Sequence, residues 1–289
     1  MSVLPPPPPP ATAATRAGPS RPPVPIWATV RDAFHLVRRN PRETMLPLFA
    51  VELPVVIFVT ALTTLLYFTA FKDEPFYVAD DLFTEGSAGA VFAFLALTAV
   101  SALFSQVARA ATIVSVAALI GGKRLPLSQA LDPAFTRMGG LLTLAFLMFA
   151  GAVVLGVTVV GIVVLPILAL RLGLTVEAFM LDGGNPFQAL RRCWNVMGPG
   201  RNRAGALSGI MTPTMLRLLA VFLVIVLLVA VPVLAVNATG ELARGSRTAQ
   251  IWLSGLLTVV QTILLLPVFA WVSATMTSFY LQARQRADG

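Results

Sequence analysis

Long apolar runs separated by short polar stretches make up most of the chain after residue 45. Six of these runs are long enough for a membrane-spanning helix, which needs about 20 apolar residues. Only Gly161 and its neighbours separate the third run from the fourth, which predicts a tight hairpin. Pro213 and Pro267 predict kinks in the last two runs, because proline removes a helix hydrogen bond. The predicted spans are 45–71, 88–120, 141–160, 162–181, about 204–236 and about 249–281.

Three shorter segments, 26–39, 125–138 and 185–197, are amphipathic at helical spacing. Each of them precedes a pair of apolar runs, so the pattern predicts three units of one interfacial helix and one membrane hairpin. Little more than an Ala-Phe or Ala-Leu pair is shared between the units, so the repeat is weak. The apolar sets are Trp27, Val30, Phe34 and Val37; Leu127, Leu131, Ala134, Phe135 and Met138; and Phe187, Leu190, Trp194 and Met197.

The composition agrees with a membrane protein. Hydrophobic residues make up 57% of the 289 positions and charged residues 12%, about half the charged share of an ordinary soluble domain. With one cysteine and one histidine, the chain has no disulfide framework, and zinc clusters and most histidine chemistry are excluded. We therefore predict an all-α polytopic membrane helix bundle, residues 26–289, with six transmembrane helices and short amphipathic interfacial helices on the cytoplasmic side.

The first 25 residues form a separate region. They contain ten prolines and no apolar segment of the kind found in a secretory signal peptide. Such a composition predicts a disordered cytoplasmic tail that acts as a solvated spacer. Binding to a proline-recognising partner is the alternative.

The distribution of charge predicts the orientation in the membrane. The loop at 72–86 carries five acidic residues against one lysine, whereas four arginines lie between residue 26 and the first span. The positive-inside rule then places both termini in the cytoplasm, in a multi-pass protein of the cell inner membrane. The net charge of +8 flanks apolar spans, so anionic lipid headgroups explain it better than nucleic acid. The four arginines between residue 26 and the first span are Arg31, Arg38, Arg39 and Arg42.

Five charged residues fall within or beside the predicted spans. Each costs about 2.5 to 3.5 kcal/mol in a bilayer, so such residues usually pair with one another or line a wet cavity. Their similar depths predict a network in the inner half of the bundle. It either locks helix packing, with arginines reaching the interface, or receives an anionic headgroup or solute. The predicted network comprises Glu52, Arg109, Arg171, Glu177 and Arg217.

Two short motifs carry a resemblance to a known family. "VEAFMLDGGNPFQALRRCWNVMGPG" and the C-terminal "FYLQARQRADG" are similar to motifs of the glycerophosphoryl diester phosphodiesterase membrane-domain family. "LIGGKRLPLSQAL" also resembles that family's stretch after the long second helix. Gln282 and Ala283 stand where the family usually has Asp and Leu, so the ion pair of that Asp is absent. The resemblance implies a six-helix membrane fold and no phosphodiesterase activity, because the catalytic domain of that name is a separate soluble barrel.

The sequence contains no HExxH, GxSxG, Walker or CxxC motif, and no cofactor is expected. The leading hypothesis is a non-enzymatic integral membrane protein that binds anionic lipid or partner proteins, including further copies of itself. It could move an amphiphile at the inner leaflet. A small-solute transporter that uses the charged network is the alternative, and a membrane-bound lipid-modifying enzyme comes third. Cys193 and His35 are expected to be packing residues, and the candidate headgroup contacts are Arg191, Arg192, Arg201 and Arg203.

Overall fold

The computed structural model describes residues 26–72, 87–156, 172–197 and 246–288. All regular secondary structure in these ranges is α-helical, which confirms the predicted fold class for this part of the chain. The helices are α1 (Ile26–Arg39), α2 (Pro41–Thr69), α4 (Ala88–Ile120), α5 (Leu127–Thr136), α6 (Met138–Gly156), α8 (Thr175–Asp182), α9 (Pro186–Met197) and α11 (Arg247–Asp288).

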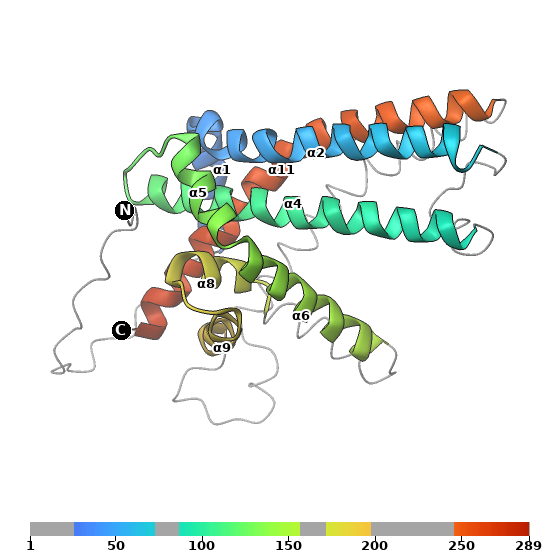
Figure 1. Ribbon diagram of the computed structural model, residues 1–289. Coiled ribbons are helices and arrows are strands. Elements are labelled where there is room, and N and C mark those ends of the chain that lie inside the picture. The colour runs from blue at the N-terminus through green and yellow to red at the C-terminus, as the bar shows by residue number, and fades with distance from the viewer. Residues whose placement is uncertain (1–25, 73–86, 157–171, 198–245, 289) are drawn as a thin grey trace, which may run out of the picture.

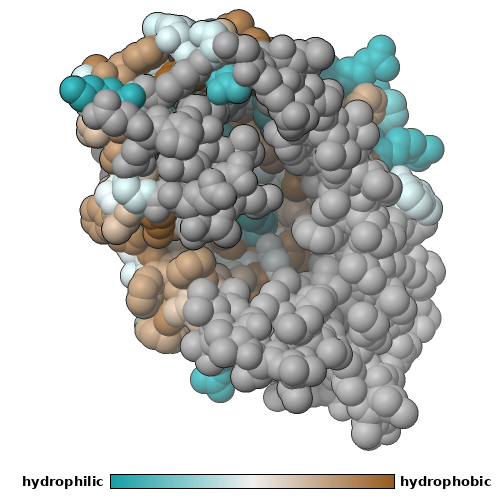
Figure 2. Space-filling view, turned by 90° about the vertical axis from the view of Figure 1, so that its right-hand side faces the viewer, coloured by the Kyte–Doolittle hydropathy of each residue, from teal (hydrophilic) through white to brown (hydrophobic). Residues whose placement is uncertain are grey.

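Three of these helices, α2, α4 and α11, are long and apolar enough to cross a membrane. They run beside one another along the molecule (Figure 1). Many of their large apolar side chains point outward: Phe58, Phe92 and Leu264 are between 61% and 75% exposed. The described part of the left flank in Figure 2 is accordingly mostly apolar. An outer surface of this kind is compatible with an integral membrane protein, since soluble proteins rarely expose large apolar patches.

A fourth candidate span is bent. α5 and α6 meet at 60° around Arg137, and the pair passes the same length and hydropathy test only when taken as one element. Three to four of the described helices are therefore candidate spans. The predicted fifth span, about 204–236, and residues 157–171 of the predicted hairpin lie outside the described residues. Six transmembrane helices thus stay a prediction.

One part of the predicted span pattern is wrong. Residues 162–181 were expected to form one continuous helix, but Gly173 and Leu174 form a turn before α8 begins. Glycine weakens a helix because its backbone loses the most conformational freedom when it is fixed. Leu174 takes φ −102° and ψ 16°, which is outside the helical region. Residues 175–181 of the predicted span thus belong to a separate short helix.

The buried core lies at the end of the molecule where the short helices gather. In α4, every residue from Val107 to Val116 except Arg109 is buried, whereas Phe92 near its start is 75% exposed. Figure 1 shows α1, α5, α8 and α9 around this buried half of α4. The first residue of α2 and the last residues of α4 and α11 lie at the same end. We call it the short-helix end.

Close packing between α6 and α8 requires a glycine at position 140. A Cβ built at Gly140 would overlap the ring of Phe179, whereas one built at Gly139 meets nothing within 4 Å. We therefore expect Gly140→Ala to lower stability by about 1 to 3 kcal/mol, the usual cost of overpacking a core. Gly139→Ala is the matched control and should stabilise, since alanine favours a helix by about 0.8 to 1.0 kcal/mol over glycine. Thermal unfolding in detergent compares the two variants. Equal changes in melting temperature would contradict the close contact between Gly140 and the Phe179 ring.

Candidate functional site

The short helix α8 is the centre of the polar contacts at the short-helix end. Its sequence, "TVEAFMLD", is mostly apolar, and it is buried from Thr175 through Met180 apart from partly exposed Val176. Gly183 and Gly184 follow it with φ of 75° and 87°, a conformation that glycine adopts without strain. Because α8 is buried, its two acidic residues, Glu177 and Asp182, are held inside the protein on one short helix.

Arg109 of α4 holds the first of these acids. Its Nη2 lies 2.7 Å from Oε1 of Glu177 and 3.4 Å from the carbonyl oxygen of Gly173. The Glu177 side chain is fully buried, while that of Arg109 is 31% exposed. A buried carboxylate needs such a partner, because a lone charge in a low dielectric costs several kcal/mol. This contact brings together two members of the predicted network.

Glu52 of α2 is bound differently from the prediction. Its Oε1 accepts a hydrogen bond of 2.6 Å from the Ser105 hydroxyl, and no arginine pairs with it among the described residues. Ser105 and Arg109 are one turn apart on α4, so adjacent positions of the same helix contact the two acids. The two remaining members of the predicted network, Arg171 and Arg217, lie outside the described residues.

Three side chains from two other helices surround Asp182. Its carboxylate accepts a hydrogen bond from the Tyr280 hydroxyl and forms ion pairs with Arg192 of α9 and Arg284 of α11. The distance from Arg284 Nη1 to Asp182 Oδ1 is 2.7 Å. Sequence reasoning did not assign this site, although Asp182, Arg192, Tyr280 and Arg284 all lie in the two motifs quoted for the resemblance. Those motifs, about a hundred residues apart, thus meet in space.

Arg137 completes the contacts of α8. Its Nη1 donates to the carbonyl oxygens of Phe179 and Met180 at 2.9 and 3.3 Å, and its guanidinium lies 5.9 Å from the centre of the Phe179 ring. Carbonyl groups in the last turn of a helix have no partner within it, and a cation there also complements the helix dipole. The sequence pattern did not indicate this role of Arg137. We call Arg109, Arg137, Glu177, Asp182, Arg192, Tyr280 and Arg284 the α8 polar cluster.

The C-terminal part of α11 also holds α1. The Thr29 hydroxyl donates to Oε1 of Gln282 at 3.2 Å, and Nε1 of Trp271 donates to the carbonyl oxygen of Val30 at 3.3 Å. Gln282 occupies the position at which the resemblance implies an aspartate, and it accepts a neutral hydrogen bond there instead. Both termini of the described chain therefore pack against each other at the short-helix end.

The three predicted amphipathic segments are helices, namely α1, α5 and α9, but only part of each predicted apolar set faces the core. Val37 and Ala134 are buried, and Leu131, Met138 and Leu190 pack against the core. Small residues turn inward in each, and large aromatic residues from the predicted sets turn outward. The inward residues are Thr29, Ala33 and Val37; Ala130 and Ala134; and Ala189 and Cys193. The outward residues are Trp27 at 68%, Phe34 at 51%, Phe135 at 46%, Phe187 at 64% and Trp194 at 43% exposure.

This division has a simple physical cause. Helices approach closely only where their contacting side chains are small, so alanine, threonine and cysteine face the bundle. The aromatic side chains are then left on the opposite side, where tryptophan favours the boundary between lipid and water. We call Trp27, Phe34, Phe135, Phe187 and Trp194 the interfacial aromatic set.

Of the four candidate headgroup contacts, two are described and they differ. Arg191 is exposed on α9, as predicted for a residue that faces phosphates. Arg192 is only partly exposed and pairs with Asp182 in the protein. Arg201 and Arg203 lie outside the described residues. The structure therefore leaves Arg191 as the described candidate for a headgroup contact.

Cys193, the single cysteine of the chain, is buried on α9. Burial raises the pKa of its thiol from the ordinary 9.0 to about 12, although a hydrogen bond with Thr175 lowers the pKa in part. We expect no labelling by maleimide at pH 7 to 9 until the protein is unfolded, because the thiolate is the reactive form. The unfolded thiol ionises near pH 9, so this group stabilises fully below that pH and progressively less towards pH 12. Rapid labelling of the native protein would contradict the assignment.

No group of three or more histidine, cysteine or acidic side chains in the described ranges is arranged to hold a metal ion. Comparison of the chain with protein-family models, curated proteins and solved structures gives no match. The resemblance to the glycerophosphoryl diester phosphodiesterase membrane-domain family therefore stays a prediction.

Proposed function

We propose that the protein is a non-enzymatic integral membrane protein of the cell inner membrane that gathers anionic lipid around its short-helix end. In this proposal both termini lie in the cytoplasm and the chain crosses the membrane six times. The shared end of α2, α4 and α11 supports a common side for the termini. The acidic loop at 72–86 then lies on the outer side, as the positive-inside rule expects.

The observation that carries the proposal is the interfacial aromatic set. Three separate helices at one end of the molecule each bury small residues and expose aromatic ones. Arg191 lies beside this surface on α9, and Arg38 and Arg39 end α1. Aromatic rings bind at the lipid headgroup level, and each nearby cation contributes about 1 kcal/mol of attraction to an anionic membrane. The combination favours anionic lipids over neutral ones.

A small-solute transporter is the alternative function, and the charged network was its main support. Arg109 and Glu177 contact each other directly and join α4 to α8, and Asp182 joins α8 to α9 and α11. These contacts explain the buried charges as bonds between helices. They therefore favour the packing interpretation of the network and leave lipid binding as the better-supported function.

Fluorescence quenching by brominated lipid tests the proposal. A protein that keeps Trp194 as its single tryptophan is reconstituted in mixed bilayers of phosphatidylglycerol and phosphatidylcholine, with bromine on one lipid at a time. At equal mole fractions we expect brominated phosphatidylglycerol to quench Trp194 more strongly than brominated phosphatidylcholine, because the anionic lipid collects around α9.

Trp252 provides the matched control. It is 62% exposed in the first turns of α11, and α11 begins at the end of the molecule opposite to the short-helix end (Figure 1). A protein with Trp252 as its single tryptophan should be quenched equally by the two brominated lipids. Equal quenching at Trp194 as well would contradict the proposed lipid preference, and absence of quenching at both positions would contradict insertion in the membrane.

A further inference from the structure

A cavity lined by charged and apolar residues opens at the short-helix end, between the start of α2, the end of α4 and the start of α5. Its volume is about 290 Å³. This is near the lower limit for small-molecule sites, about 300 Å³, so it has room for a lipid headgroup and not for a whole lipid. The lining residues that carry the argument are Arg42, Glu43, Leu46, Ser115, Arg124 and Leu127.

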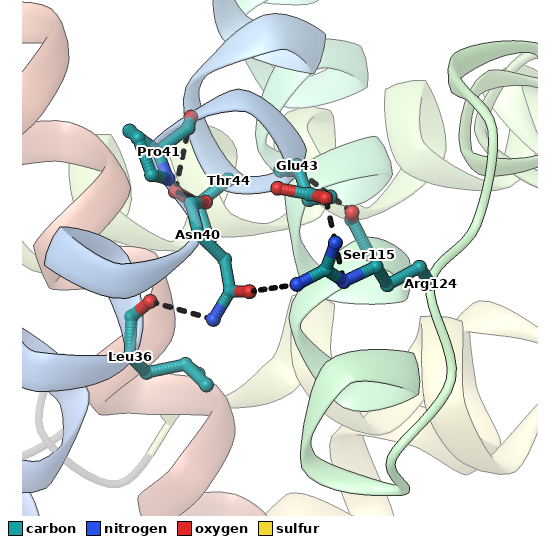
Figure 3. A network of polar contacts seen from close by, with 7 residues as sticks. All are labelled: Leu36, Asn40, Pro41, Glu43, Thr44, Ser115 and Arg124. Atoms are coloured by element: carbon teal, nitrogen blue, oxygen red, sulfur yellow. Dashed lines mark hydrogen bonds and ion pairs between the residues drawn. The ribbon is translucent and has the colours of Figure 1, made fainter.

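Hydrogen bonds between the helices fix the walls of this cavity (Figure 3). The Ser115 hydroxyl of α4 donates to the carbonyl oxygen of Glu43 at 2.7 Å, which ties the first turn of α2 to α4. Asn40 donates to the carbonyl oxygen of Leu36 at 3.1 Å and accepts from Arg124 at 3.5 Å. The cavity is therefore built by packed helix ends, and the hydrogen bond from Ser115 fixes the backbone of Glu43 in its wall.

The charges of the cavity are unequal. Arg42 and Arg124 oppose the single carboxylate of Glu43, which leaves one net positive charge. The Arg124 side chain is 74% exposed and lies 3.7 Å from the Glu43 carboxylate, so this ion pair is loose and the guanidinium has donors left for a ligand. The Glu43 side chain is 18% exposed and lines the cavity, and a carboxylate has more acceptor sites than this one ion pair uses.

These charges select among headgroups. A phosphodiester brings the one negative charge that balances the site, and arginine binds phosphate oxygens with two parallel hydrogen bonds. An ammonium substituent would compete with Arg124 for Glu43, whereas hydroxyl groups donate to a carboxylate without displacing the arginine. The apolar walls at Leu46 and Leu127 suit the glycerol backbone and the first carbons of acyl chains.

We propose that this cavity binds a phosphodiester headgroup that bears hydroxyl donors, such as the phosphoglycerol headgroup of an anionic lipid. Arg42 and Arg124 hold the phosphate, and Glu43 accepts hydrogen bonds from the hydroxyls. The inference rests on the proposed function and names the lipid class at one defined site.

Calorimetric titration of the full-length protein in neutral detergent tests it. The probes are dihexanoyl phosphatidylglycerol, dihexanoyl phosphatidylethanolamine, glycerophosphoglycerol and inorganic phosphate. We expect the short-chain phosphatidylglycerol to bind about tenfold more tightly than the phosphatidylethanolamine, and Arg42→Gln or Arg124→Gln to weaken it about tenfold, since each removes a charge-assisted hydrogen bond. Arg31→Gln is the control, because this exposed arginine of α1 does not line the cavity.

The outcomes separate the two proposals. Equal binding of both short-chain lipids, or no effect of Arg42→Gln and Arg124→Gln, would overturn the headgroup assignment. Glycerophosphoglycerol or phosphate binding as tightly as the lipid would overturn the lipid source in favour of a soluble phosphate compound. If the titration fails while Trp194 still prefers brominated phosphatidylglycerol, the lipid-gathering function stands without this site.

Discussion

Replacing Arg109 with glutamine should cost about 3 to 5 kcal/mol of stability, the usual loss when one partner of a buried ion pair is removed. The variant leaves the Glu177 carboxylate fully buried without its cation, and Oε2 of that carboxylate already has no hydrogen-bond partner among the described residues. Glu177→Gln should cost less, because the remaining guanidinium is 31% exposed and reaches water. Thermal unfolding in detergent measures both variants.

The double variant Arg109→Gln with Glu177→Gln should recover part of the loss, since two neutral amides can bond to each other. Asp32→Asn is the matched control. Asp32 and Arg31 lie 3.9 Å apart with side chains 72% exposed, and exposed pairs contribute about 0 to 1 kcal/mol. Equal effects of Asp32→Asn and Arg109→Gln would show that the Arg109–Glu177 pair does not hold α4 to α8.

Asp182→Asn should have the second largest effect. The substitution keeps the shape of the side chain but removes the charge that Arg192 and Arg284 share. Tyr280→Phe removes only one hydrogen bond to the same carboxylate, worth about 1.5 to 3 kcal/mol for a charged acceptor. We therefore expect Asp182→Asn to lower the melting temperature more than Tyr280→Phe.

A second measurement shows whether α9 is released. Cys193 is buried on α9, one residue after Arg192, so weakening the contact with Asp182 should make the thiol accessible to maleimide below the melting temperature. Gly139→Ala is the control, because a Cβ added at that position meets nothing within 4 Å. Unchanged labelling and melting in Asp182→Asn would contradict the role assigned to the α8 polar cluster.

Hydrophobic periodicity was sufficient to predict most of the described helices. The long helices α2, α4 and α11 follow from apolar runs, and α1, α5 and α9 follow from amphipathic spacing. The start of α8 was not predicted, because the sequence around Gly173 stays apolar on both sides and hydropathy alone cannot show a turn. A short helix that is buried in a protein core has the same apolar composition as a piece of a membrane span. Composition therefore does not distinguish the two.

The candidate site was predictable only in part. Depth along the helices indicated that Arg109 and Glu177 lie at similar levels, and the structure brings them together. Depth alone could not predict that Ser105 contacts Glu52 or that Arg137 contacts the end of α8, because these contacts depend on how each helix is rotated about its axis. The inward faces of α1, α5 and α9 were predicted only in part, for a related reason. Hydrophobicity ranks tryptophan and phenylalanine above alanine, whereas close helix packing favours the smaller side chain.

The most direct test of the account is the lipid that remains bound when the protein is extracted from its own membrane. Mass spectrometry of the purified protein compares the bound lipid with the total lipid of the same membrane. We predict that anionic phosphodiester lipids are enriched in the bound fraction, and that Arg191→Gln reduces the enrichment because Arg191 is exposed beside the aromatic residues of α9. A bound fraction with the same composition as the total membrane lipid, in the wild type and in Arg191→Gln alike, would contradict the proposal that the short-helix end gathers anionic lipid.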